Sequence, residues 1–254
     1  MKKLLLFLFL FSSLSATFGQ AVLEDERYVP ETDPLVLQKL EQWQDIKFGL
    51  LMHWAPYWPP FDRNVNYDPA LYPEKWETFV QFTHNQLLEL LTDYGDVDIL
   101  WLDGGWVKKR DQHNLDENYA GKFAENKAGN GFIKHRIVSQ DIRMDELVAK
   151  ACQKQPGLIV VDRAVYGKNQ NYLTPENRVP EKELPYPWES CIISGGGWSY
   201  TPDADYMSGR EGIQMLVDIV AKGGNLLLNI APSPEGEWQE GAYQLLDEFG
   251  AWKY

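Results

Sequence analysis

Short apolar runs that alternate with helical patterns constrain the fold of this chain more than any other feature. Five runs are rich in Val, Ile and Leu and are typical of buried strands, at residues 46–53, 97–103, 158–163, 191–194 and 225–230. Near-continuous apolarity suits strands covered on both faces, as in parallel sheets. Amphipathic helical patterns lie between these runs, at residues 74–94, 141–154, 208–222 and 240–252. The alternation predicts a parallel α/β fold.

The interval at residues 54–74 does not fit this alternation. It carries five prolines and shows no strand pattern. A structureless connection of that length counts against a complete compact domain. Five strands are also too few for a closed (β/α)8 barrel, which needs eight. The sequence therefore predicts a TIM-like barrel that is incomplete near this interval.

Composition excludes nucleic acid as a partner and leaves room for sugars. The 24 Lys and Arg against 37 Asp and Glu give a net charge of −13, without the basic excess that phosphates require. The 10 Trp, 13 Tyr and 11 Phe offer flat apolar surfaces for sugar rings. Cys152, Cys191 and four scattered histidines form no zinc, metal or CxxC motif. One disulfide is conceivable, but two buried free thiols are favoured.

Residues 1–19 have the pattern of a secretory signal peptide. Lys2 and Lys3 precede eight consecutive Leu or Phe residues, and Thr17 and Gly19 suit cleavage before Gln20. The apolar run is too short to span a bilayer, although an uncleaved amphipathic anchor is the alternative. We expect residues 20–254 to form one exported domain, in the periplasm or outside the cell.

Polar side chains end three of the predicted strands. Asp103 ends one strand between Trp101 and Trp106, while His53 and Arg163 end two others. In parallel barrels the reacting groups lie at the carboxyl ends of the strands. A carboxylate between two indoles is well placed to reach a sugar carbon. The alternatives are a turn or cap role for Asp103, a structural His53 and a surface ion pair for Arg163.

Glycoside hydrolysis needs a second carboxylate, because one group attacks while the other protonates the leaving oxygen. Two candidates follow Asp103: Glu176, in Tyr-Leu-Thr-Pro-Glu, and Glu189, in Pro-Trp-Glu. Their spacing alone does not decide between them.

Four segments together resemble the retaining α-L-fucosidase family of glycoside hydrolases. They occur in the family's order, at residues 47–54 (KFGLLMHW), 101–106 (WLDGGW), 188–191 (WESC) and 222–229 (KGGNLLLN). The resemblance extends from about residue 40 to the end of the chain. It implies a (β/α)8 catalytic barrel that acts on fucosylated oligosaccharides or glycoconjugates without a cofactor.

The resemblance also implies a role for individual residues. Asp103 matches the aspartate that attacks the sugar and forms a covalent fucosyl-enzyme. Glu176 matches the usual acid/base, with Glu189 as the second choice. His53, Trp101 and Arg163 match positions that contact fucose.

The sequence departs from the family pattern after its first strand. The family's His-His-Asp-Gly-Phe strand end is absent, since no two histidines are adjacent in this chain. The departure predicts an internal deletion near residues 57–61 that removes barrel strands two and three, and no C-terminal β-sandwich follows. The expected function is α-L-fucosidase; the alternative is an impaired or inactive family member that binds sugar weakly.

Overall fold

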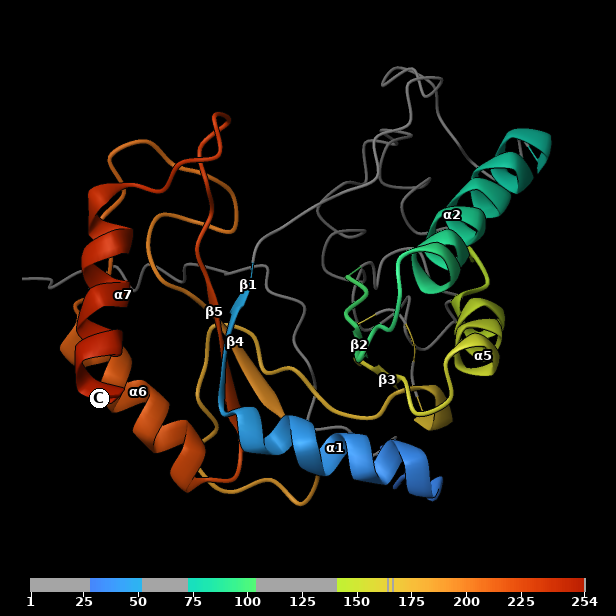
Figure 1. Ribbon diagram of the computed structural model, residues 1–254, viewed down its shortest axis with the longest axis horizontal. Helices are drawn as coiled ribbons and strands as arrows, with labels where there is room; N and C mark the ends of the chain where they lie inside the picture. The colour runs from blue at the N-terminus through green and yellow to red at the C-terminus, as the bar shows by residue number, and fades with distance from the viewer. Residues whose placement is uncertain (1–27, 52–72, 104–140, 164, 166, 254) are drawn as a thin grey trace, which may run out of the picture.

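The computed structural model describes residues 28–51, 73–103, 141–163, 165 and 167–253 (Figure 1). Its elements are α1 (Pro34–Ile46), β1 (Phe48–Leu51), α2 (Pro73–Asp93), β2 (Ile99–Leu100), α5 (Met144–Lys154), β3 (Ile159–Val160), the 3-10 helix η2 (Gly167–Asn169), β4 (Glu189–Ile193), α6 (Gly209–Ala221), β5 (Asn225–Asn229) and α7 (Glu240–Lys253). Each predicted run overlaps one of these strands, with β4 beginning two residues before the predicted run at 191–194, and each predicted helical pattern overlaps a helix. The predicted signal peptide, His53 and the junction at residues 57–61 lie outside the described residues.

All strand pairs between these elements are parallel, which confirms the predicted parallel α/β fold. One sheet has the order β1-β5-β4, with Phe48 opposite Leu226 and Glu189 opposite Asn225. A second sheet joins β2 to β3, with Ile99 opposite Ile159.

The extended segment at residues 172–176 connects the two sheets. Isolated parallel bridges join Val161 to Tyr172 on one side and Leu173 to Trp188 on the other. Backbone hydrogen bonds support both edges, including one of 2.8 Å from the Asn171 amide to the Val160 carbonyl and one of 2.9 Å from the Glu189 amide to the Leu173 carbonyl. The lateral order is therefore β2, β3, residues 172–176, β4, β5 and β1, a continuous parallel arc.

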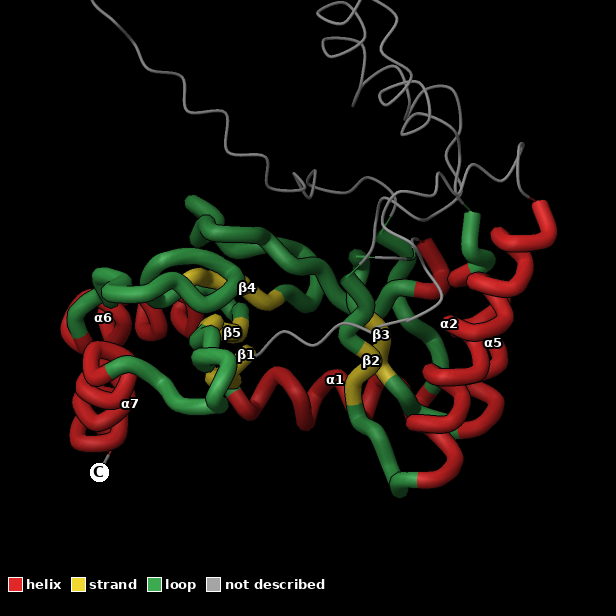
Figure 2. The backbone as a smooth tube through the Cα atoms, turned by 90° about the horizontal axis from the view of Figure 1, so that it is seen from above, coloured by secondary structure: helices red, strands yellow, loops and turns green. Residues whose placement is uncertain are grey.

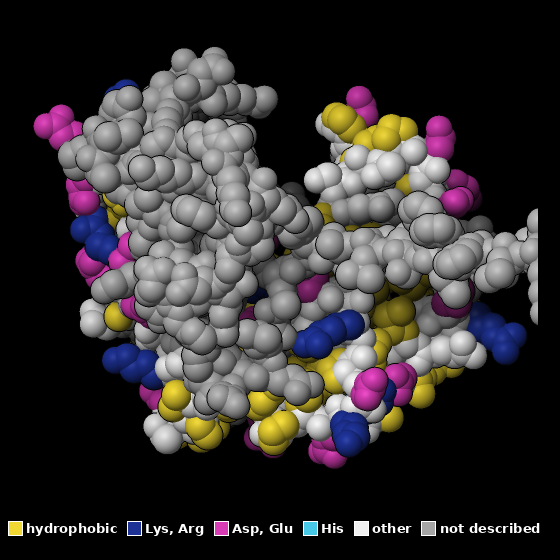
Figure 3. Space-filling model, turned by 180° about the vertical axis from the view of Figure 1, so that it is seen from behind, with side chains coloured by type: hydrophobic (Ala, Val, Ile, Leu, Met, Phe, Trp, Pro, Cys, Tyr) yellow, Lys and Arg dark blue, Asp and Glu magenta, His cyan; other side chains and the backbone are white. Residues whose placement is uncertain are grey.

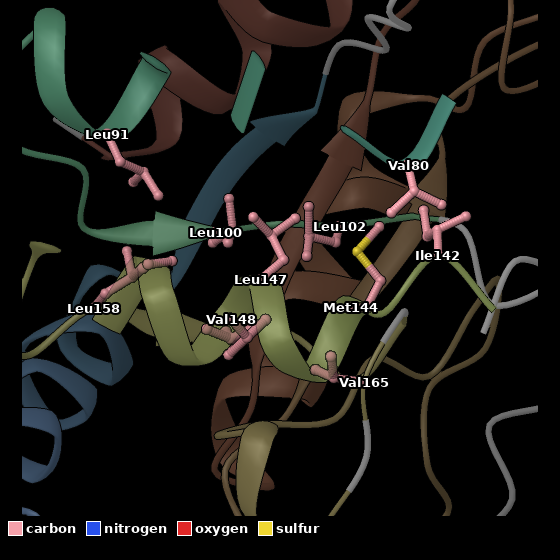
Figure 4. Packing of buried hydrophobic residues seen from close by; sticks show 12 residues of the cluster. Val80, Leu91, Leu100, Leu102, Ile142, Met144, Leu147, Val148, Leu158 and Val165 are labelled. Carbon is pink, nitrogen blue, oxygen red and sulfur yellow. The ribbon is translucent and has the colours of Figure 1, made fainter. Parts of the chain in front are cut away.

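Alternate residues of β2 and β3 face opposite sides of this arc, as the two-residue period of a strand requires. Leu100, Leu102 and Val160 pack against α2 and α5, where Met144, Leu147 and Val148 point toward them (Figure 4). The intervening residues belong to a second cluster, made of Val36, Leu40, Trp43, Ile159, Val161 and Tyr172 with Ile99 and Trp101 packed against it. By the same period, Trp101 and Asp103 share a face that is turned away from α2 and α5.

Helix α1 is an element that the apolar pattern did not predict. Asp33 caps it by accepting a hydrogen bond from the Leu35 amide at 2.9 Å. Its buried residues Val36, Leu40 and Trp43 contact β3 and Tyr172, so α1 runs beneath both sheets (Figures 1 and 2). The helix ends at Lys47, whose φ of 65° is left-handed, and the strand predicted from residue 46 therefore begins at Phe48.

Helices α6 and α7 cover the sheet formed by β1, β5 and β4. Their contacts form the third cluster, which includes Trp188, Leu216, Ile219, Leu226, Leu228, Leu245 and Phe249. A capping box begins α6: the Ser208 amide donates to Glu211 at 2.9 Å, and the Glu211 amide donates to the Ser208 hydroxyl at 3.3 Å.

On the face seen in Figure 3, the charged side chains of the described residues are dispersed. Asp and Glu side chains lie at several separate places there, with Lys and Arg among them. Within the described ranges, none of the helices has the length and apolar character needed to cross a membrane.

Candidate active site

Arg163 is the centre of the polar cluster at the carboxyl ends of β2 and β3. It follows β3 and is only 5% exposed. Its Nε donates to the Thr174 hydroxyl at 2.9 Å, its Nη1 to Glu176 Oε2 at 2.7 Å, and its Nη2 to the Cys191 sulfur. The guanidinium therefore ties the end of β3 to the next extended segment and to β4.

Asp103 reaches the same guanidinium from the end of β2. Its Oδ1 lies 3.7 Å from Arg163 Nη1, the atom that also binds Glu176. These two carboxylate oxygens are consequently at most about 6.4 Å apart, a limit that admits the spacing of about 5–5.5 Å that retaining glycosidases show between their carboxyl groups. The Asp103 side chain is 36% exposed, whereas that of Glu176 is 11% exposed.

The charge of Arg163 is secured by its neighbours. Burial alone would lower the pKa of Arg163, but Cys191, Glu176 and Asp103 outweigh burial, and the net shift is upward. Burial raises the pKa of the Cys191 thiol to about 12, so this thiol is neutral at ordinary pH. The site thus holds one permanent positive charge between two carboxyl groups.

A second row of side chains fixes the orientation of Arg163. The Thr174 hydroxyl accepts from Arg163 and donates to Asp162 Oδ1 at 2.7 Å. Asp162 is buried, and burial raises its pKa while the Thr174 hydrogen bond and the Arg163 charge oppose that rise. The Thr174 hydroxyl therefore links the Asp162 carboxyl to the Arg163 guanidinium and restricts the orientation of that guanidinium.

Trp101 and Glu189 form the inner wall beside Arg163. The Arg163 Cζ lies 4.9 Å from the centroid of the Trp101 ring, within the range of a cation–π contact. Trp101 Nε1 donates to Glu189 Oε1 at 3.2 Å. Burial raises the pKa of Glu189 to about 7, although the Trp101 hydrogen bond and the neighbouring Trp43 and Tyr172 side chains oppose the rise.

The structure brings most of the predicted site residues together. Asp103, Trp101, Arg163 and Glu176 lie in one cluster, and Glu189 lies behind Trp101. His53 is outside the described residues, so its place is not part of this geometry. Cys152 and Cys191 are both free, as predicted, but only Cys191 is buried, whereas Cys152 is partly exposed. Among the described residues, no group of His, Cys, Asp and Glu is arranged to hold a metal ion.

Sequence reasoning missed the contribution of Thr174. It stands two positions before Glu176 in an extended segment, so both side chains lie on the same face. That spacing was the available signal, because a pair of polar residues on one face of an extended segment suits contact with a shared group.

Comparison with known protein families identifies the family to which this chain belongs. The family model described as "Alpha-L-fucosidase" matches residues 60–253. The chain belongs to the α-L-fucosidase family. The resemblance stated from the four sequence segments is thereby confirmed.

Curated relatives carry the same family name. The plasma α-L-fucosidase of Rattus norvegicus is 28% identical over 216 residues, which is 82% of this chain and 40% of that protein. The plasma α-L-fucosidase of Homo sapiens is 26% identical over 215 residues, again 82% of this chain and 40% of that protein. This fucosidase-family chain thus spans about two fifths of the length of these relatives.

Solved structures of fucosidases share the fold. The α-L-fucosidase isoenzyme 1 from Paenibacillus thiaminolyticus has a TM-score of 0.53 and 25% identity, covering 69% of this chain and 39% of that chain. The enzyme from Vibrio sp. strain EJY3 has a TM-score of 0.52 and 28% identity, covering 74% and 29%. An α-L-fucosidase from Bacteroides thetaiotaomicron covers 90% of this chain and 61% of that chain with a TM-score of 0.55 and 19% identity, which supports the fold alone.

Proposed function

We propose that this protein releases terminal α-L-fucose from glycans with retention of configuration, using Asp103 as nucleophile and Glu176 as acid/base. The observation that carries the proposal is the shared contact of both carboxylates with Arg163 Nη1. Membership in the α-L-fucosidase family supplies the substrate class.

In the first step, an Asp103 oxygen attacks the anomeric carbon while Glu176 gives its proton to the glycosidic oxygen. The glycosidic bond breaks, the aglycone leaves as an alcohol, and an ester joins fucose to Asp103. In the second step Glu176, now a carboxylate, takes a proton from water, and the resulting hydroxide equivalent attacks the same carbon. The ester bond breaks and both carboxyl groups return to their starting states.

The remaining site residues position the sugar. The partial exposure of Asp103 leaves it accessible to a ligand, whereas Arg163 is held by Thr174 and Glu176 and can donate only within that frame. Trp101 offers an apolar ring next to the guanidinium. We assign fucose contacts to Arg163 and Trp101, and to His53 on the strength of the family resemblance.

An impaired enzyme is the second candidate, and the length of one connection favours it. Only residues 52–72 separate β1 from α2. A strand–helix–strand unit takes about 30 residues or more, so this interval is too short for two additional strands with their helices. We infer that barrel strands two and three are missing between β1 and β2, and that sugar binding and turnover are weakened by their loss.

Export is part of the proposal. The Lys-Lys start, the Leu and Phe run and the small residues before Gln20 support a cleaved signal peptide and a periplasmic or extracellular protein. N-terminal sequencing of the exported protein should begin near Gln20. Recovery of the protein from the cytoplasm with Met1 retained would contradict this part.

The catalytic assignment is tested with 4-nitrophenyl α-L-fucoside and with the configuration of the first product. Asp103→Ala should abolish hydrolysis, while Glu176→Ala should regain activity with azide because azide needs no general base. Glu189→Ala serves as the matched control, since it removes a carboxylate of the same cluster. Azide rescue of Glu189→Ala alone would reverse the acid/base assignment, and an inverted product would refute the covalent intermediate.

A further inference from the structure

The buried carboxylate of Glu189 has no part in the two chemical steps above. Glu189 opens β4 and is 5% exposed. Its Oε1 accepts from Trp101 Nε1 at 3.2 Å, and Trp43 and Tyr172 also interact with the carboxylate. Three aromatic side chains from α1, from the end of β2 and from the 172–176 segment therefore converge on one acidic group.

Burial of the Glu189 carboxylate carries a free-energy cost. Burial of a carboxylate in an aromatic setting disfavours its charged form, and the pKa of Glu189 rises to about 7. The Arg163 charge acts in the opposite direction and favours the ionised form.

Trp101 connects Glu189 to the reacting end of the site. The Trp101 ring packs against the cluster of Ile159, Val161 and Tyr172 and is overlaid by the Arg163 guanidinium at 4.9 Å. A rotation of the indole that broke its bond to Glu189 would remove the face that Arg163 occupies. Arg163 in turn binds Glu176 and lies near Asp103, so the position of the indole bears on both carboxyl groups.

We propose that Glu189 is a positioning residue of the fucose site: its carboxylate holds the indole of Trp101, and the indole supports the guanidinium of Arg163. The role of this site as a fucose site rests on the proposed function. The hydrogen bond between Glu189 and Trp101, and the effect of Glu189 ionisation on Trp101, are independent of the proposed function.

The emission of Trp101 provides a test that requires no turnover. The full chain is titrated from pH 5 to 9 while its tryptophan fluorescence is recorded, and the spectra of Trp101→Phe are subtracted. We expect a Trp101 component with a midpoint near pH 7, since the charge appears at the indole N–H. Glu189→Gln keeps the acceptor and the shape but cannot ionise, so the component should vanish in this variant.

The other titratable groups near Glu189 are accounted for by controls. Tyr172 has a pKa well above its ordinary value and Cys191 one of about 12, so neither changes charge in this range. Arg163 stays charged throughout. Asp162 has a raised pKa, and Asp162→Asn should leave the Trp101 component in place.

Each outcome decides the proposal. Absence of a Trp101 component, or its persistence in Glu189→Gln, overturns the inference.

In a second experiment, L-fucose is titrated into the same proteins and into Glu189→Leu. Glu189→Leu should bind L-fucose about tenfold more weakly than the unmodified chain, while Glu189→Gln should bind it within about twofold of the unmodified chain. If Glu189→Leu does not fold, Glu189→Gln and Trp101→Phe still decide the spectroscopic arm. If no protein binds L-fucose, the proposed function fails, and the fluorescence result still stands for or against Glu189.

Discussion

Replacing Arg163 with leucine should destabilise the protein strongly, because three hydrogen-bond partners of this buried cation, Thr174, Glu176 and Cys191, would lose their bonds. Arg163 is 5% exposed and Glu176 is 11% exposed, so their ion pair is largely shielded from water. Removal of one member of a buried pair costs about 3–5 kcal/mol. Asp103 adds little to this sum, since it lies at 3.7 Å and is 36% exposed.

Two further variants separate charge from geometry. Arg163→Lys keeps the charge but cannot reproduce the planar fork that reaches Thr174, Glu176 and Cys191 together, so we expect a loss of about 1–3 kcal/mol. In Arg163→Leu with Glu176→Gln, the unpaired charge is also removed. That double variant should therefore be more stable than Arg163→Leu alone by about 1–3 kcal/mol.

The assay is urea unfolding followed by far-ultraviolet circular dichroism at pH 7, with free energies obtained by linear extrapolation. Substitution of the exposed Glu41 by glutamine provides a surface control that should change stability little. The reasoning is refuted if Arg163→Leu costs less than about 1 kcal/mol, or if adding Glu176→Gln lowers stability further.

Three other outcomes follow from the structure. The native pKa of Glu189, about 7, lies above its ordinary 4.5, so the native state binds this proton more tightly than the unfolded chain does. The free energy of unfolding should therefore fall by about 3 kcal/mol as the pH rises from 4.5 to 7. Urea titrations at each pH should show this fall in the unmodified chain and not in Glu189→Gln. Gly224→Ala should cost about 1–3 kcal/mol, since its Cβ would lie 2.4 Å from the Trp188 ring, whereas Gly250→Ala meets nothing and should be neutral or stabilising. The chain as it stands should hydrolyse 4-nitrophenyl α-L-fucoside slowly. Insertion of the strand-two and strand-three segment of a fucosidase relative at residues 57–61 should raise the rate by about a hundredfold or more, because small misplacements of reacting groups have such effects. Ordinary turnover without the insertion would contradict the inferred deletion.

The strands and their polar ends could be predicted because their signals are local. Continuous apolar runs mark β1, β2, β3, β4 and β5, and the two-residue period then places Trp101 and Asp103 on one face. Parallel pairing puts the end of β3, with Arg163, next to the end of β2, with Asp103. The nucleophile candidate and its cation were therefore accessible from the sequence.

The neighbours of Arg163 could not be predicted in the same way. The 172–176 segment has only isolated bridges, to Val161, Trp188 and Cys191, and its Thr-Pro-Glu sequence carries no strand pattern. Its place between β3 and β4 depends on contacts distant in sequence, which local patterns do not encode. Helix α1 was missed for a related reason: three buried residues over thirteen positions are a weak periodic signal.

The proposed choice of Glu176 over Glu189 as acid/base rests on their partners rather than on burial, since both side chains are largely enclosed. An acid/base must reach the oxygen that leaves when the nucleophile attacks, so the two carboxyl groups must share one side of the site. Glu176 binds the nitrogen that also faces Asp103, whereas Glu189 accepts a hydrogen bond from the indole beneath the guanidinium. A raised pKa near 7 would make Glu189 the more obvious proton donor from titration alone. Geometry comes first in such assignments, because a proton cannot be passed to an atom out of reach, and on this ground we propose Glu176 as the acid/base and Glu189 as the support of Trp101.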